Sequence, residues 1–200
     1  MAGRREQTVA RILDGAAAAF AKGGFAGTSM EEIASAAGVS KLLLYRDFAG
    51  KQELYQAVLE RTLNRVVEEV PLAASNDSLQ ALIAVARSDP DGFVLAFRHA
   101  AREPVFAGFV ADVLERWVRA SEKLLRPIEP DPTMRRWAAE MTMQITYQSI
   151  ITWLEHGDPA RDEEFFRRLL SVNRAVAKPP PAPHGERPHG ERPHGERGAR

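Results

Sequence analysis

The sequence predicts an all-helical protein with two folded domains and a disordered C-terminal tail. Apolar residues recur at spacings of three and four through most of the chain, which is the period of an amphipathic helix. Clusters of Gly and Pro divide this pattern into segments of helical length. No segment shows the strict alternation of apolar and polar residues that predicts a strand. With 200 residues, 44% of them hydrophobic, the chain can bury a core of its own, and we expect about nine helices.

The first two predicted helices are separated by a glycine pair. The apolar stripe of the first helix consists of Val9, Ile12, Leu13, Ala16 and Phe20. Gly23 and Gly24 end this helix. Thr28 or Ser29 can cap the second helix, whose first turn carries two glutamates that suit the helix dipole, and Gly38 is placed to end it.

A third short helix and a longer fourth helix follow. Ser40 can cap the third helix, which runs to about Phe48, and the fourth begins near Lys51 and stops before Pro71. The two short helices, joined by a tight Gly-containing turn, form a helix-turn-helix over about residues 29–48. In this motif the second helix is held so that side chains near its N-terminus enter a DNA major groove.

Five more helical segments are expected beyond Pro71, separated by turns that contain Pro or Gly. They cover residues 79–87, 93–102, 105–126, 133–156 and 160–177. The predicted domains are therefore 1–66, which contains the helix-turn-helix, and 67–178, which is helical throughout.

Residues 179–200 differ in composition from the rest of the chain. They hold a Pro-rich stretch and three copies of Pro-His-Gly-Glu-Arg, with almost no apolar side chain. Such a segment cannot bury enough surface to offset the entropy cost of ordering, so we predict a disordered tail. A second interpretation stays open, because one histidine in each repeat gives spaced ligands that can bind Ni or Zn.

Composition and charge exclude several classes of protein. The chain has no cysteine, which excludes disulfide scaffolds and cysteine-ligated zinc or iron–sulfur sites. Its 27 basic and 27 acidic side chains balance, so it does not coat nucleic acid through a strongly basic surface. No apolar run reaches the roughly 18 residues of a membrane span, and no targeting segment is visible, so we expect a cytoplasmic protein. No metal and no cofactor are expected.

The third predicted helix has one buried and one exposed face. Leu44 and Phe48 lie one turn apart and would face the core, whereas Lys41, Tyr45 and Arg46 fall well away from that face. Two cations and an aromatic hydroxyl that project together suit the phosphates and base edges of DNA.

Five short motifs in the first third of the chain point to a family. They are Ala-Ala-Ala-Ala-Phe-Ala-Lys-Gly-Gly-Phe at 16–25, Thr-Ser-Met-Glu-Glu-Ile-Ala at 28–34, Ala-Gly-Val-Ser-Lys at 37–41, Leu-Tyr-Arg-Asp-Phe at 44–48 and Gly-Lys-Gln-Glu-Leu at 50–54. Through them, residues 5–66 resemble the N-terminal DNA-binding domain of the TetR/AcrR family of transcriptional regulators. The rest of the chain resembles this family only in being helical and in its length.

The resemblance implies DNA contacts from the helix-turn-helix and the start of the fourth helix. The residues at the matching positions are Thr28, Ser40, Lys41, Leu43, Tyr45, Arg46 and Lys51. Thr28 would contact a phosphate, and Lys51 would clamp another together with the N-terminus of its helix. The alternative for each residue is a purely structural role, as a helix cap, a solvated charge or a packed side chain.

The resemblance also implies that 67–178 is a ligand-binding and dimerisation domain. In the family, the last two long helices, here 133–156 and 160–177, form a four-helix bundle with their copies in a homodimer. The central helices enclose a pocket for a small, usually hydrophobic inducer. The pocket candidates are Phe97, His99, Phe106, Trp117, Gln144 and Tyr147. Each of these could instead pack in the core. We expect a repressor that binds a palindromic operator and is released by its inducer.

Two features depart from the family pattern. Leu42 and Leu43 stand where relatives commonly carry Gly or Pro followed by Thr, Ser or Ala. They could contact thymine methyl groups, or one of them could pack inward. Asp47 stands where His or Tyr is frequent. Its carboxylate would repel phosphate unless Arg46, Lys51 or another cation pairs with it, or it could accept a hydrogen bond from a cytosine amino group.

Two other function classes stay open. The chain could be a protein-interaction module that keeps the helical fold with weakened DNA reading, and Leu42, Leu43 and Asp47 favour this alternative. It could also be a small-molecule enzyme, although it has no Gly-rich phosphate loop, no His-Glu-x-x-His, no Gly-x-Ser-x-Gly and no paired inward acids. We therefore expect no catalytic residues.

Overall fold

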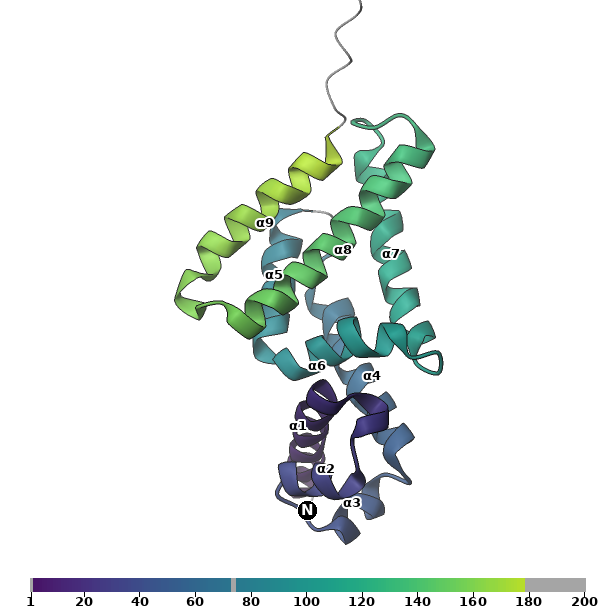
Figure 1. The fold of residues 1–200 in the computed structure, drawn as a ribbon, viewed down its shortest axis with the longest axis vertical. Helices are drawn as coiled ribbons and strands as arrows, with labels where there is room; N and C mark the ends of the chain where they lie inside the picture. The colour runs from purple at the N-terminus through teal and green to yellow at the C-terminus, as the bar shows by residue number, and fades with distance from the viewer. Residues whose placement is uncertain (1, 73–74, 179–200) are drawn as a thin grey trace, which may run out of the picture.

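The computed structural model describes residues 2–72 and 75–178, and within these ranges every regular element is a helix (Figure 1). The α-helices are α1 (Ala2–Gly27), α2 (Met30–Ala36), α3 (Lys41–Asp47), α4 (Lys51–Glu69), α5 (Asn76–Ser88), α6 (Pro90–Val94), α7 (Ala107–Leu125), α8 (Pro132–His156) and α9 (Asp162–Ala177). A π-helix η1 (Leu95–His99) and two 3₁₀ helices, η2 (Ala100–Arg102) and η3 (Pro159–Arg161), complete the set. The all-helical prediction is confirmed, and the predicted tail, 179–200, lies outside the described residues.

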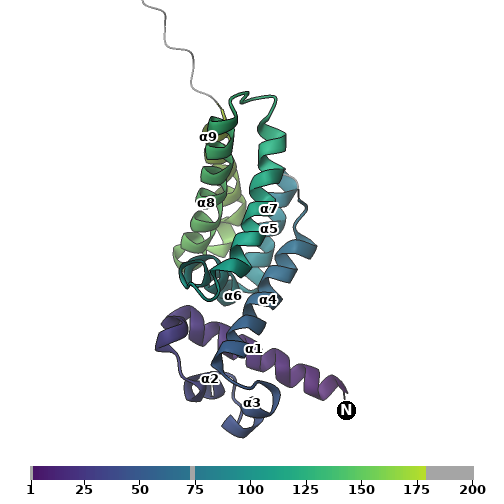
Figure 2. The ribbon, with the colours of Figure 1, turned by 90° about the vertical axis from the view of Figure 1, so that its right-hand side faces the viewer.

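The helices form two groups along the long axis of the molecule. Helices α1 to α3 lie at one end and α5 to α9 pack at the other, with α4 passing from the first group into the second (Figures 1 and 2). One buried core runs through both groups, from Ile12 in α1 to Leu169 in α9. The predicted domain boundary, between 66 and 67, falls inside α4, so the division into two domains remains a prediction. None of the helices in the described ranges combines the length and apolar character of a membrane span.

The local signals at the start of the chain fix α1 and α2. Ile12, Ala16 and Phe20 of the predicted stripe are fully buried. Gly24 interrupts α1 with a φ of 66°, a left-handed conformation that glycine adopts without steric cost. The cap of α2 is Ser29: its Oγ accepts a hydrogen bond from the backbone N–H of Glu32, whose carboxylate in turn accepts the N–H of Ser29.

The turn between α2 and α3 is held against α1 by direct backbone approach. A Cβ atom at Gly15 would lie only 2.5 Å from the backbone nitrogen of Ala37, so only glycine fits there. Arg11 of α1 donates hydrogen bonds to the carbonyl oxygens of Ala37 and Gly38, at 3.0 and 2.9 Å. Gly38 has a φ of 61°, as expected for a glycine that ends a helix. The helix-turn-helix is therefore fixed to α1.

The region expected as one helix over 93–102 has a different form. Residues 88–92 were predicted as a break, but Pro90 occupies the first turn of α6 and Asp89 caps it by accepting the N–H of Gly92 at 3.2 Å. Pro fits this position because its missing N–H would have no partner inside the helix. The chain then forms the wider π-helix η1 and the narrower 3₁₀ helix η2 before α7 begins at Ala107.

Candidate nucleic-acid interface and ligand pocket

Helix α3 presents a polar face to solvent, as predicted. Ser40 caps the helix by accepting the N–H of Leu43 at 3.2 Å. Leu44 is fully buried and Phe48 nearly so, which anchors one side of α3 in the core. Lys41, Tyr45 and Arg46 are exposed on the other side, and the ammonium of Lys41 lies 5.8 Å from the centre of the Tyr45 ring.

The cations of this face all have partners within the chain. Lys41 donates to the carboxylate of Glu31 in α2. This hydrogen bond lowers the pKa of Glu31 and raises the pKa of Lys41. Such exposed ion pairs contribute little stability, so they can exchange for phosphate contacts at small cost.

The carboxylate of Asp47 is paired with two arginines. Arg46 donates to it at 2.7 Å, and Arg5 of α1 lies at 3.2 Å. The hydrogen bond from Arg46, with a smaller contribution from Arg5, lowers the pKa of Asp47. The Asp47 side chain is only 3% exposed, because the arginines cover it. Of the partners considered for Asp47, Arg46 does pair with it, and the other cation is Arg5 rather than Lys51.

The structure places Thr28 inside the molecule and Lys51 beside it. The Thr28 side chain is 4% exposed, and its hydroxyl donates to the carbonyl oxygen of Gly24 at 2.8 Å. Lys51, the first residue of α4, donates to the carbonyl oxygen of Thr28 at 2.9 Å and lies 4.6 Å from the centre of the Phe25 ring. The role of Thr28 as a cap is therefore corrected, because Ser29 caps α2. A phosphate contact from the Thr28 hydroxyl would have to replace this internal hydrogen bond.

The two leucines of α3 differ in exposure. Leu42 is 83% exposed, whereas Leu43 is half-buried. The predicted interface contained Leu43, but the leucine that projects from α3 is Leu42. Leu43 is the leucine that turns toward the protein, which agrees with the alternative that one of the two packs inward.

An aromatic cluster joins the two groups of helices. Phe25, just after the kink in α1, stacks edge-on against Tyr55 of α4 and Phe106, with ring centres 5.3 and 5.1 Å away. The backbone N–H of Phe25 also donates to the carboxylate of Glu103 at 3.2 Å. Burial, helped by the nearby Glu103 charge, raises the pKa of Tyr55. Because Phe25 also lies under Lys51, this cluster connects the α3–α4 end directly to the segment that precedes α7.

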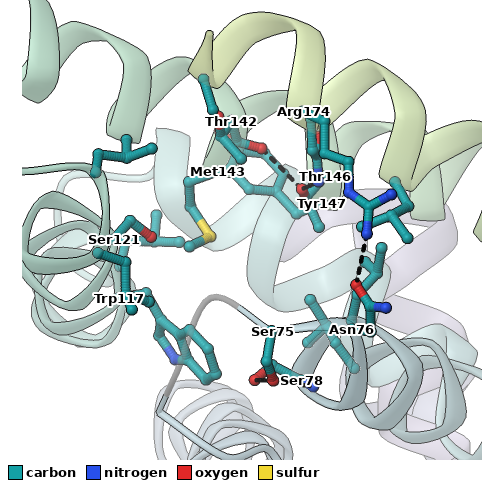
Figure 3. Close-up of a pocket in the computed structure, with 18 of the residues that line it drawn as sticks. Ser75, Asn76, Ser78, Trp117, Ser121, Thr142, Met143, Thr146, Tyr147 and Arg174 are labelled. Atoms are coloured by element: carbon teal, nitrogen blue, oxygen red, sulfur yellow. Dashed lines mark hydrogen bonds between the residues drawn. The ribbon is translucent and has the colours of Figure 1, made fainter. Parts of the chain in front are cut away.

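A cavity of about 420 Å³ lies between α5, α7, α8 and α9 (Figure 3). Three of the six pocket candidates line it, namely Phe97, Trp117 and Tyr147. Phe97 and Tyr147 stack with ring centres 5.8 Å apart. The cavity is of a size that encloses small molecules, and its lining is mostly apolar.

The other three pocket candidates lie elsewhere. Phe106 is buried in the aromatic cluster beside Tyr55. His99 lies at the end of η1 near Gly24, and Gln144 is exposed on α8. The wide turn of η1 and the rotation of α8 decide which way these side chains face, and neither can be read from the spacing of apolar residues.

Polar side chains on one wall of the cavity were missed in the sequence. Thr146 donates to the carbonyl oxygen of Thr142 at 2.7 Å, and Asn173 of α9 donates its amide to Thr146 at 2.8 Å. This arrangement leaves the amide oxygen of Asn173 and the hydroxyl of Thr142 buried and without a hydrogen bond to any residue that the structure describes. At the rim, Arg174 reaches Asn76 at 3.4 Å (Figure 3). Within residues 2–72 and 75–178, no group of three or more His, Asp or Glu side chains is arranged to hold a metal ion.

Comparison with known proteins finds similarity over the helix-turn-helix and beyond it. A family model described as bacterial regulatory proteins, tetR family, matches residues 12–58. The chain is 31% identical over 166 residues to the HTH-type transcriptional activator FasR of Mycolicibacterium smegmatis, a match that covers 78% of this chain and 76% of FasR.

Solved structures show the same fold. A TetR-like transcriptional regulator from Rhodococcus sp. RHA1 matches with a TM-score of 0.71 and 21% identity over 86% of this chain and 93% of the other. The crystal structure of AibR in complex with isovaleryl coenzyme A and operator DNA matches with a TM-score of 0.64 and 18% identity, over 82% of this chain and 97% of AibR.

Proposed function

Since the chain belongs to the tetR family of bacterial regulatory proteins and is a DNA-binding transcriptional regulator, we propose that a small hydrophobic ligand controls its binding to an operator. In this proposal the protein is a cytoplasmic homodimer, and each copy inserts α3 into a major groove of a palindromic site. The single observation that carries the proposal is the presence, in one chain, of an exposed helix-turn-helix face and a largely apolar cavity.

The proposed DNA contacts come from α3 and the start of α4. Ser40, Lys41, Leu43, Tyr45 and Arg46 lie on α3 or at its cap, and Lys41, Tyr45 and Arg46 are exposed. Lys51 stands at the N-terminus of α4, where Gly50 gives no side-chain cap. Backbone N–H groups and a lysine together suit a phosphate there. Thr28 would act through its carbonyl contact to Lys51 rather than as a direct contact.

The proposed ligand has a large apolar part and a small polar group. Phe97, Trp117 and Tyr147 supply aromatic walls, and Thr142 and Asn173 supply buried polar atoms that lack a partner among the described residues. An unpaired buried polar atom costs roughly 1–3 kcal/mol, which a hydrogen bond to a ligand would recover. That AibR was crystallised with isovaleryl coenzyme A and DNA supports joint ligand and DNA binding on this fold.

The proposed dimer forms through α8 and α9. An uncharged stripe with helical spacing runs along α8 and consists of Met134, Trp137, Met141, Gln144 and Gln148. Met134 and Trp137 are 45% and 50% exposed, and Val172 on α9 is 46% exposed. Large apolar side chains that are exposed on adjacent helices are typical of a surface that another copy covers.

We infer that the protein is a repressor whose ligand releases it from DNA. The alternative is an activator, because the similar protein FasR is named a transcriptional activator. The selected operator is placed first within a promoter and then upstream of it, and transcription is measured in vitro. This experiment distinguishes repression from activation. Transcription that falls on adding protein and recovers on adding ligand supports repression, and transcription that rises contradicts it.

The proposed function as a whole is tested by selection of DNA from a random pool, followed by native mass spectrometry for a co-purified ligand. We expect a palindromic selected site. Ser121→Phe should fill the cavity, because Ser121 lines it from α7 and is buried. This variant should keep DNA binding and lose the ligand mass and the ligand response. Folded, dimeric protein that selects no DNA would contradict the DNA-binding part.

A protein-interaction module is the second candidate, and the exposure of Leu42 favours it. The same selection experiment distinguishes the two candidates. A protein-interaction module that does not recognise DNA sequence would enrich no sequence from the random pool.

A further inference from the structure

Leu42 is the most exposed large hydrophobic side chain among the residues that the structure describes, at 83%. Isolated apolar residues are common on protein surfaces and by themselves need no explanation. Leu42 differs because it lies in the first turn of α3, in the middle of the face that carries Lys41, Tyr45 and Arg46.

The geometry of α3 places Leu42 at the point farthest from the core. Successive residues of an α-helix are rotated by about 100°, so Leu42 lies about 160° from the buried Leu44. Arg46 lies about 40° from Leu42 on one side and Tyr45 about 60° on the other. A molecule that approaches α3 from the side opposite the core therefore meets Leu42 first. On that side Leu42 lies between the guanidinium of Arg46 and the phenol ring of Tyr45.

The chemistry around Leu42 restricts what that object is. Lys41 and Arg46 carry charges that suit phosphates, and both side chains are themselves more than half exposed or close to it, at 50% and 56%, although the Asp47 partner of Arg46 is covered. Leu42 itself neither donates nor accepts hydrogen bonds. In the major groove of DNA, the apolar group on a base edge is the C5-methyl of thymine. A cationic rim with a central apolar contact matches a thymine methyl between two phosphate backbones.

We propose that Leu42 is a specificity-determining residue that reads thymine in each half-site by packing against its C5-methyl group. This inference rests on the proposed insertion of α3 into the major groove, and it assigns one base to one side chain. It also explains why a leucine is tolerated at a polar surface, because DNA covers it in the functional complex.

The test begins with DNA selected by the wild-type protein. Each thymine of the selected site is then replaced in turn by deoxyuridine, which removes the methyl group and leaves base pairing intact. We expect replacement at one symmetric pair of positions to weaken binding by about fourfold per half-site, the value of one buried methyl group. Replacement at the other positions should have little effect.

The same series with Leu42→Ala assigns the effect to the side chain. We expect this variant to bind the thymine and deoxyuridine sites with equal affinity, because it lacks the contact. Leu72→Ala is the matched control: Leu72 is 51% exposed, lies beyond the C-terminal end of α4 and does not line the cavity, and this variant should keep the full deoxyuridine penalty. Thermal unfolding of Leu42→Ala should match the wild type, since a residue so exposed adds little to the core.

The results separate this inference from the proposed function. Tight, sequence-specific binding with no deoxyuridine penalty, or with an equal penalty in Leu42→Ala, overturns the assignment of Leu42 and leaves the regulator intact. Absence of any selected DNA overturns both, and Leu42 is then part of a protein-binding surface.

Discussion

The helix-turn-helix end and the cavity end of the molecule are built in opposite ways. Around α2 and α3, short helices are fixed by caps and by backbone contact to α1, and the candidate DNA-contacting side chains project into solvent. Between α5 and α9, long helices leave about 420 Å³ unfilled, and the candidate functional side chains point inward. The first arrangement suits a surface that must keep one shape, and the second suits a core that changes when it is filled.

The largest expected effect comes from the end of the molecule that does not contact DNA. Trp137→Asp places a charge in the uncharged stripe of α8 and should separate the proposed dimer. Linking two binding sites typically raises affinity by about 10²–10⁴, so operator binding should fall by at least about 100-fold. Light scattering and gel-shift titration measure the two changes. Val105→Asp, at a 63% exposed position before α7, is the control. Unchanged mass in Trp137→Asp would refute the dimer surface.

A smaller loss is expected from the proposed DNA-contacting surface itself. Lys51→Ala should weaken binding to every sequence by about tenfold, the value of a charge-assisted hydrogen bond. The slope of log affinity against log salt should fall by about 0.9 for each phosphate that the variant no longer neutralises. Fluorescence anisotropy at several salt concentrations measures this, with Lys123→Ala on α7 as control. An altered base preference with an unchanged slope would contradict a phosphate role.

The cavity end depends on an ion pair that acid should weaken. Arg87 of α5 donates two hydrogen bonds to Asp162 of α9, at 2.9 and 2.6 Å, and the indole of Trp153 donates a third at 2.6 Å. The pKa of Asp162 is lowered, mainly by Arg87 and also by Trp153. A carboxylate with a lowered folded-state pKa stabilises the protein above its unfolded pKa of about 4 and loses this effect as pH falls further.

Asp162→Asn should therefore lower the free energy of unfolding by about 1–2 kcal/mol at pH 7. The difference from wild type should shrink as pH falls below about 4, the unfolded-state pKa, toward the lowered folded-state pKa of Asp162. Urea unfolding at several pH values measures both. Asp77→Asn, at an exposed position of α5, is the control. A difference that stays constant down to pH 2 would mean that the charge of Asp162 is not responsible.

The smallest expected effect lies at the junction of the two ends. Glu103→Ala removes the acceptor for the N–H of Phe25. Basal operator affinity should change by no more than about fivefold, since an average hydrogen bond contributes about 1 kcal/mol. The ligand-induced change in affinity should shrink, because the contact joins the cavity end to α1. Glu103→Gln keeps an acceptor oxygen and should behave as wild type. An unaltered ligand response in Glu103→Ala would exclude this contact from the coupling.

Sequence predicted the helix-turn-helix end well because its signals are local. Ser40 and the glutamates of α2 act within one turn, and the stripe of α1 needs only the helical period. The pairing of Asp47 with Arg5 spans 42 positions, and only the possibility of some cation partner could be foreseen. Three of the pocket candidates do not line the cavity, for a related reason. Whether Gln144 faces the cavity or solvent depends on how α8 rotates between α7 and α9, a property of the neighbouring helices.

The absence of a side chain at Gly15 has a consequence for regulation. It brings α1 into backbone contact with the turn before α3, leaving no deformable layer of side chains at that point. The head formed by α1, α2 and α3 is therefore expected to have few internal degrees of freedom and to move as one body. In the proposed dimer, filling the cavity can alter the separation of the two heads but not the shape of either. Under this proposal the ligand would act on the spacing between the two heads, which has to match the distance between the half-sites, and not on the bases that each head reads.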